Sequence, residues 1–151
     1  MDLSYREPLP VIVSNIKEIS GRSLQGAIDP AILGFDLHTV LSMSIEEYVA
    51  MTINRMCQAA LLHSQGNGLL VNYTQLPDAI WSRVLPYFGL EYSDQEIDIM
   101  KRGSSFNAKQ PDLKYVDDTE EKNRKASNFV RQMAEKWVIP VYQELEARRL
   151  A

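Results

Sequence analysis

Arg6, Pro8 and Ser14 form a pattern near the start of the chain that could bind an anion. Arginine presents a planar fork of donors that suits phosphate. A proline two residues later is typical of the first turn of a helix, so Ser14 would lie about two turns into that helix and could donate a further hydrogen bond. The other interpretation is a surface arginine paired with Glu7 or another carboxylate, beside an ordinary helix serine. Spacing alone favours that second interpretation.

Tyr73 ends the short apolar segment 69–73, which follows a glycine and predicts a buried strand. In open α/β folds, ligands bind at the carboxyl ends of strands. A tyrosine at that position could stack on a base or cap a pocket. The alternative is a partly buried core tyrosine, and the local sequence favours this alternative.

Ser105, Phe106 and Lys109 belong to a third candidate segment, 102–109, which is polar. Small donors, an aromatic ring and a flanking cation suit a nucleotide, with phosphate contacts beside a stacking ring. Taken alone, the segment is simply a polar loop with one hydrophobic anchor. The chain contains neither GxxxxGK[ST] nor GxGxxG, so no standard phosphate loop supports these candidates.

In this order, the three segments resemble the C-terminal portion of the sulfotransferase family. Its members transfer a sulfuryl group from 3′-phosphoadenosine 5′-phosphosulfate (PAPS) to a hydroxyl or an amine. The resemblance implies that PAPS or adenosine 3′,5′-bisphosphate is the cofactor, that no metal is needed, and that the acceptor is an unidentified small molecule or conjugate. It assigns the 3′-phosphate to Arg6 and Ser14, the adenine to Tyr73, and further nucleotide contacts to Ser105, Phe106 and Lys109.

The chain departs from the family pattern in ways that limit this expectation. Thr74 and Gln75 replace the acidic pair that usually follows the tyrosine. The family's phosphosulfate loop, with its essential lysine, and its catalytic histidine would both precede residue 1. We therefore assign no catalytic residue and expect the chain to keep only the nucleotide side, with weak or no catalysis alone.

Two further hypotheses compete with this one. The chain is alternatively a non-catalytic helical interaction or oligomerisation module derived from that fold, in which a second copy covers exposed apolar surface. A third hypothesis is that the reading frame starts too late and upstream codons supply the missing loop.

The elements that must position these residues can be predicted from periodicity and capping signals. We expect strands at 3–5 and 69–73, helices at 8–20, 44–65, 76–89 and 93–102, a long loop at 22–43 with at most one helical turn, a polar loop at 103–120, and a long helix at 121–149 that Pro140 kinks or divides. A buried strand needs partners, because its backbone groups must be paired. The prediction is an α/β, P-loop NTPase-like sulfotransferase fold in truncated form, mostly helical with one or two short parallel strands.

Composition restricts the class of protein. The 151 residues fit a single domain, 1–151, and 45% of them are hydrophobic. A net charge of −4 argues against nucleic-acid or anionic-membrane partners. The single cysteine, Cys57, excludes an internal disulfide and most structural zinc sites. No apolar run reaches the ~20 residues of a membrane helix and no signal peptide is evident, so we expect a cytoplasmic protein.

Overall fold

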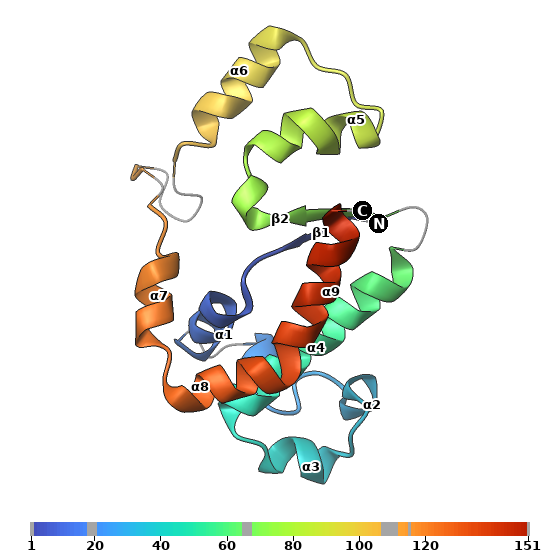
Figure 1. The fold of residues 1–151 in the computed structure, drawn as a ribbon, viewed down its shortest axis with the longest axis vertical. Helices are drawn as coiled ribbons and strands as arrows, with labels where there is room; N and C mark the ends of the chain where they lie inside the picture. Colours follow the sequence, from blue (N-terminus) through green and yellow to red (C-terminus); the bar gives the residue numbers. More distant parts are fainter. Residues whose placement is uncertain (1, 18–20, 65–67, 107–111, 115, 151) are drawn as a thin grey trace.

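A computed structural model describes residues 2–17, 21–64, 68–106, 112–114 and 116–150. Within this part, the chain is mostly helical and has one two-stranded parallel sheet at its centre (Figure 1). This confirms the predicted combination of helices with short parallel strands. Among the described residues, no helix combines the length and the apolar character needed to cross a membrane.

The sheet pairs β1 (Asp2–Tyr5) with β2 (Leu69–Asn72), and Tyr5 lies opposite Asn72 in the register. Neighbouring side chains on a strand point to opposite faces. Accordingly, Leu70 belongs to the main core, whereas Leu69 and Val71 pack with Ala79 in a smaller second cluster. Both faces of β2 are thus covered, which explains why its sequence is a continuous apolar run.

Between the strands, α1 (Pro8–Lys17) begins at Pro8 as predicted, and α4 (Ile45–His63) begins after Ser44, whose Oγ accepts a hydrogen bond of 3.1 Å from the Glu47 amide. The prediction of a loop with at most one helical turn at 22–43 is wrong. That segment contains η1 (Gly21–Ser23), α2 (Pro30–Leu33) and α3 (Leu37–Ser42). Side-chain caps start the two α-helices at Asp29 and Asp36. Helices this short show no periodicity that a sequence window could detect.

After β2 come η2 (Tyr73–Gln75), the π-helical segment η3 (Ile80–Val84), α5 (Leu85–Tyr87) and α6 (Asp94–Gly103). Tyr73 is therefore the first residue beyond the strand, not its last. The predicted capping box of Ser93 and Glu96 is confirmed at the start of α6.

The C-terminal part contains α7 (Thr119–Lys125), α8 (Asn128–Met133), the π-helical segment η4 (Ala134–Val138) and α9 (Ile139–Leu150). We predicted one long helix from 121 that Pro140 kinks or divides. The helical region is divided, but not at Pro140. The break lies at Ala126, which has an extended backbone, and Ser127 caps the next helix through the Val130 amide. From Asn128 onward the helical segments follow one another without a break through Pro140.

The π-helical segments explain how the helix passes Pro140. Both π segments of the described residues end two positions before a proline, at Val84 before Pro86 and at Val138 before Pro140. Proline lacks an N–H and clashes with the carbonyl one turn earlier in a regular α-helix. A π turn, which is wider than an α turn, is one of the known ways in which a helix continues past such a residue.

The main core lies where α1, α4, α8, η4 and α9 meet beside β1. Its largest fully buried side chains include Tyr48, Ile12, Met51 and Leu145. In contrast, α5 and α6 lie on the other side of β2 from this body (Figure 1). This division leaves the carboxyl ends of both strands next to α1 and α7, where the candidate site is found.

Candidate functional site

Arg6 and Tyr73, predicted separately as anion-binding and base-stacking residues, meet in the structure. Each is the first residue beyond its strand, and Tyr5 lies opposite Asn72 in the parallel pairing. The guanidinium carbon of Arg6 lies 4.8 Å from the centroid of the Tyr73 ring, a cation–π contact. The strand register thus places a cation and an aromatic face together at the carboxyl edge of the sheet.

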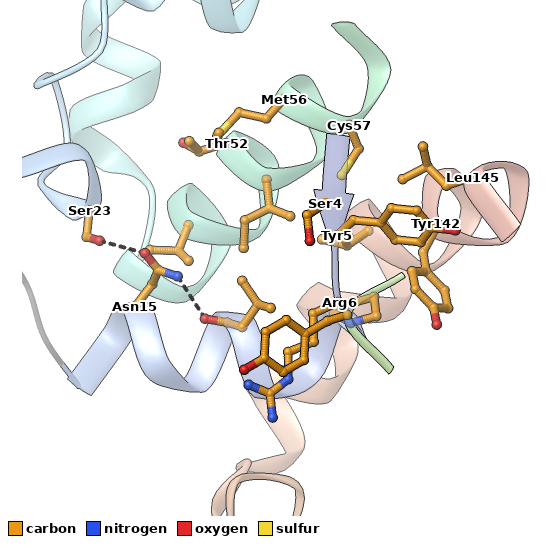
Figure 2. Close-up of a pocket in the computed structure, with 16 residues that line it drawn as sticks. Ser4, Tyr5, Arg6, Asn15, Ser23, Thr52, Met56, Cys57, Tyr142 and Leu145 are labelled. Carbon is orange, nitrogen blue, oxygen red and sulfur yellow. Dashed lines mark hydrogen bonds between the residues drawn. The ribbon is translucent and has the colours of Figure 1, made fainter. Parts of the chain in front are cut away.

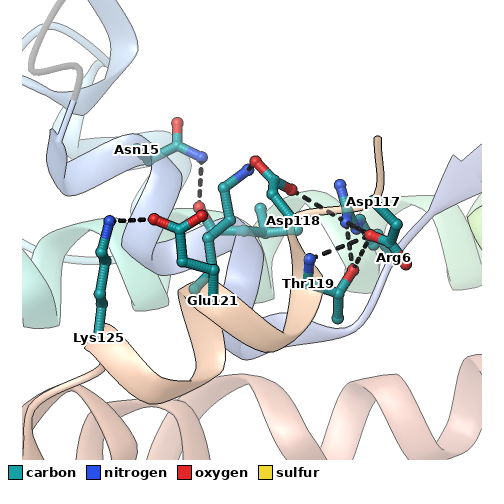
Figure 3. Close-up of polar contacts among 9 residues, drawn as sticks. Arg6, Asn15, Asp117, Asp118, Thr119, Glu121 and Lys125 are labelled. Carbon is teal, nitrogen blue, oxygen red and sulfur yellow. Dashed lines mark hydrogen bonds and ion pairs between the residues drawn. The ribbon is translucent and has the colours of Figure 1, made fainter. Parts of the chain in front are cut away.

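Acidic residues before α7 already contact Arg6. Its Nη2 donates to Asp117 Oδ1 at 3.0 Å and lies 3.5 Å from Asp118 Oδ1, and it also donates to Thr119 Oγ1 (Figure 3). The pKa of Asp117 is lowered mainly by its hydrogen bonds from Thr119, and that of Asp118 mainly by Lys122. Both carboxylates are therefore ionised at neutral pH beside the guanidinium.

The remaining donors of Arg6 decide whether an anion could bind there as well. All of its described contacts use Nη2, so Nε and Nη1 have no partner among the residues that the structure describes. A guanidinium can bind several oxygens at once because it has five N–H donors. The pairing with another carboxylate, which spacing favoured, is present, and it uses one of the three guanidinium nitrogens of Arg6 among the described residues.

A cavity of about 340 Å³ extends from Arg6 into the body of the protein (Figure 2). Its walls come from β1, α1, α4, η4 and α9, and Tyr73 and Arg6 contribute to one end. Apolar side chains such as Val11, Ile53 and Leu145 make up most of the lining. Volumes of this size are within the range of small-molecule pockets.

A polar network lies beside the cavity and links both strands to α9. Glu146 accepts hydrogen bonds from Tyr5 at 2.5 Å and Asn72 at 2.8 Å, and Arg149 Nη2 donates to its other oxygen at 2.7 Å. Above all the Arg149 hydrogen bond, together with those from Tyr5 and Asn72, lowers the pKa of Glu146 to about 2. Burial, and then the hydrogen bond to Glu146, raise the pKa of Tyr5. This network holds the carboxyl ends of β1 and β2 against α9.

Among the described residues, none of the other predicted site residues takes part in the contact between Arg6 and Tyr73. Ser14 is on α1, as expected, but the described residue of that turn that lines the cavity is Asn15. Ser105 Oγ donates to the Arg102 carbonyl at the end of α6. Phe106 is half-exposed, and its backbone forms an isolated antiparallel β-bridge with Lys114. No hydrogen bond among the described residues joins Ser105 or Phe106 to Arg6 or Tyr73. Lys109 lies outside the described residues.

Sequence reasoning favoured a carboxylate partner for Arg6 but did not identify Asp117 or Asp118 as that partner, and it missed the polar groups of the cavity. Asp117 and Asp118 lie 111 and 112 positions from Arg6, so no local pattern connects them with it. Thr52 and Asn15 gave no signal, because a single polar residue on a helix is uninformative until its neighbours are known.

No group of three or more His, Cys, Asp or Glu side chains in the described ranges is arranged to hold a metal ion. The site consists of a cation, Arg6, on the aromatic face of Tyr73 at one end of an apolar cavity. Comparison of the chain with protein-family models, with curated proteins and with solved structures gave no match.

Proposed function

We propose that this chain is a sulfotransferase-like protein, with the P-loop NTPase-like fold of that family, in which Arg6 and Tyr73 bind the 3′-phosphate and the adenine of PAPS or adenosine 3′,5′-bisphosphate. The reaction in which such a site serves is transfer of a sulfuryl group to a hydroxyl or amine acceptor. The observation that carries the proposal is the 4.8 Å contact of Arg6 with the Tyr73 ring at the carboxyl ends of two parallel strands.

The chemistry of the pair supports a ligand with both a phosphate and a ring. The donors of Arg6 that have no described partner suit phosphate oxygens. Tyr73 is half-buried and offers a ring that a base can contact. The N-terminus of α1 at Pro8 follows closely on β1, which ends at Tyr5, so the helix dipole also favours an anion at this end. Ser14, about two turns into α1, is the further donor that the resemblance assigns to the 3′-phosphate.

Titration calorimetry with adenosine 3′,5′-bisphosphate tests the proposal on the full chain. We expect equimolar binding that Arg6→Ala weakens by at least about tenfold, because a hydrogen-bonded charge pair is lost. Tyr73→Phe keeps the ring and should bind nearly as the wild type does, whereas Tyr73→Leu should weaken binding. Ser14→Ala tests the contribution of the Ser14 hydroxyl.

A matched control separates a specific site from general charge effects. Arg83→Ala removes the same charge from η3 and should leave the affinity unchanged. Equal losses in Arg6→Ala and Arg83→Ala, or no binding to the wild type, would rule out the nucleotide site. Transfer of labelled sulfate from PAPS to an acceptor tests catalysis separately from binding.

A second candidate function rests on a different observation, the exposed apolar surface around α5 and α6. Large hydrophobic side chains gather there, each between 43% and 54% exposed, namely Tyr87, Phe88, Leu90, Tyr92 and Ile99. A surface of this kind is typical of an interaction site. We propose a second copy of the chain as its occupant, which corresponds to the helical oligomerisation module.

Size-exclusion chromatography with light scattering tests this second candidate. The wild type should form a dimer that Phe88→Ser combined with Leu90→Ser converts to a monomer. Ile32→Ser, which changes a 70% exposed side chain on α2, should leave the dimer intact. A monomeric wild type at high concentration would eliminate the oligomerisation module.

A further inference from the structure

The sheet has one edge along which the backbone of β1 is not paired. In the part of the chain that the structure describes, β1 pairs with β2 on one side and with no strand on the other. Among the described residues, no backbone–backbone hydrogen bond outside the sheet uses Ser4 or Tyr5. We propose that this free edge of β1 binds an extended, apolar and uncharged peptide segment of another protein, which adds to the sheet as a third strand.

The two strands differ in how far they are covered. All four residues of β2 are buried, and Val71 is only 3% exposed. Ser4, which lies opposite Val71 in the register, is exposed. A strand at the edge of a sheet presents unpaired N–H and C=O groups and can therefore serve as a template for another chain. Of the two strands, β1 is thus the one whose free edge a partner can reach.

The cavity of about 340 Å³ lies along this free edge. Its lining includes Ser4 and Tyr5 but no residue of β2, all four of which the structure describes. Successive side chains of a strand point to opposite faces, so a cavity that both Ser4 and Tyr5 line meets the strand at its edge. Figure 2 shows β1 on one side of this space and the α4 side chains Thr52 and Met56 on the other. The cavity therefore lies where a strand paired with β1 would place its side chains.

The lining of the cavity favours an apolar and uncharged segment. Side chains such as Val11, Val49 and Ile53 surround the space. In the described lining only Arg6 is charged, and it lies with Tyr73 beyond the end of β1, at the end of the cavity where we propose the nucleotide contacts. A charge buried without a partner is costly, so a charged side chain is disfavoured along β1. A cavity of about 150 Å³ holds benzene, so this one can hold the apolar side chains of a few residues.

Strand addition is a known form of peptide recognition, in which backbone hydrogen bonds give affinity and the pockets for side chains give specificity. β1 has four residues, so a segment of similar length can pair with it at a separation of ~4.8 Å. The inference goes beyond the proposed nucleotide site, because it rests on the backbone of β1 and needs no phosphate contact.

Fluorescence anisotropy with a labelled peptide tests the inference on the full chain. The probe is fluorescein-Lys-Lys-Gly-Gly-Val-Ile-Val-Ala-Gly-amide, in which the lysines give solubility and the segment Val-Ile-Val-Ala supplies the strand. The control peptide carries N-methyl groups on the four residues of that segment, so it keeps the side chains and loses the donors for strand pairing. We expect the control peptide to bind at least about tenfold more weakly, because two or more hydrogen bonds are lost.

Variants of α4 locate the peptide on the protein. Met56→Trp enlarges a half-exposed side chain across the cavity from β1 and should weaken the probe by more than about tenfold, because the added ring occupies the space of the strand. Leu62→Trp makes the same kind of change on the same helix, at a side chain that is 66% exposed and outside the lining, and should leave the affinity unchanged. Circular dichroism establishes that each variant is folded, and Ile53→Trp replaces Met56→Trp if the latter is unfolded.

The other exposed apolar surface, around α5 and α6, supplies a further control. Phe88→Ser combined with Leu90→Ser should leave the affinity for the probe unchanged. Loss of binding in this variant would place the peptide on α5 and α6 and overturn the inference.

Three other results would also overturn the inference. They are absence of binding to the wild type, equal binding of the two peptides, which means that apolar side chains enter the cavity without strand pairing, and a wild-type dimer that Met56→Trp converts to a monomer, which means that a second copy covers the edge. None of these results bears on nucleotide binding, which calorimetry with adenosine 3′,5′-bisphosphate measures separately.

Discussion

The hydroxyl of Tyr5 donates a hydrogen bond of 2.5 Å to Glu146 Oε1, across 141 positions of the chain. Tyr5 is the last residue of β1, and Glu146 lies near the end of α9. Asn72, the last residue of β2, donates to the same carboxylate oxygen. One carboxylate thus connects the ends of both strands to the C-terminal helix, next to the Arg6–Tyr73 pair.

Replacing the carboxylate should destabilise the fold. Glu146→Gln removes the negative charge that three donors share, and we expect a loss of about 2 kcal/mol in the free energy of unfolding at pH 7. Chemical denaturation followed by circular dichroism measures this. Glu144→Gln is the matched control, because it removes an equal charge whose described partner is Arg148 on the exposed side of α9.

The difference in unfolding free energy between the wild type and Glu146→Gln should depend on pH, because the pKa of Glu146 is lowered in the folded protein. Its pKa is about 2 in the folded protein against an ordinary value of 4.5. A lowered carboxyl pKa stabilises the folded state above the unfolded pKa, and this contribution disappears as the pH falls through the folded pKa. The stability difference between wild type and Glu146→Gln should therefore be full above about pH 5 and shrink toward pH 2. A difference that is constant over this range would contradict the assigned interaction.

Tyr5→Phe should have a smaller effect than the loss of the carboxylate. The variant removes one donor while Asn72 and Arg149 still contact Glu146, so we expect a cost of about 1 kcal/mol. In a double-mutant cycle with Glu146→Gln, the two effects should not add, because the residues share one hydrogen bond. Additive effects would mean that the Tyr5 hydroxyl contributes independently of Glu146.

The carboxylates on Arg6 should compete with a bound phosphate. Asp117→Asn with Asp118→Asn removes both charges, while asparagine still serves at helix starts. If the nucleotide site is real, calorimetry should show adenosine 3′,5′-bisphosphate binding about tenfold more tightly than to the wild type. Glu121→Gln removes an acidic group of α7 that is paired with Lys125, and it should change the affinity little. Unchanged affinity in the double variant would show that these carboxylates do not oppose the ligand.

Cys57 should react slowly with thiol reagents in the native protein. Burial raises its pKa to about 11 from an ordinary 9.0, and only the thiolate is nucleophilic. At pH 8 we expect modification on the order of a hundredfold slower than in the chain unfolded by guanidinium, which serves as the control. Equal rates in both states would show that the thiol is accessible and not shielded by the cavity wall.

Local signals predicted those elements whose ends are set by neighbouring residues. The caps at Ser44 and Ser93 each join groups three positions apart, so the chain near them contains the whole interaction. The same holds for Pro8 at the start of α1 and for the apolar run of β2. The helices at 30–33 and 37–42 were missed although Asp29 and Asp36 cap them locally, because helices this short show no apolar periodicity. The break at Ala126 was missed because the apolar pattern of the sequence continues across it.

The same distinction between local signals and tertiary packing applies to the candidate site. Residue types and their order along the chain identified Arg6 and Tyr73, and strand positions implied that both stand at carboxyl ends. Only the folded chain shows that the guanidinium lies on the Tyr73 ring while contacting Asp117, 111 positions away. The cavity that α1, α4 and α9 line likewise depends on how these helices pack together. Pairings over such distances depend on side-chain packing among many elements at once, and no local pattern in the sequence encodes them.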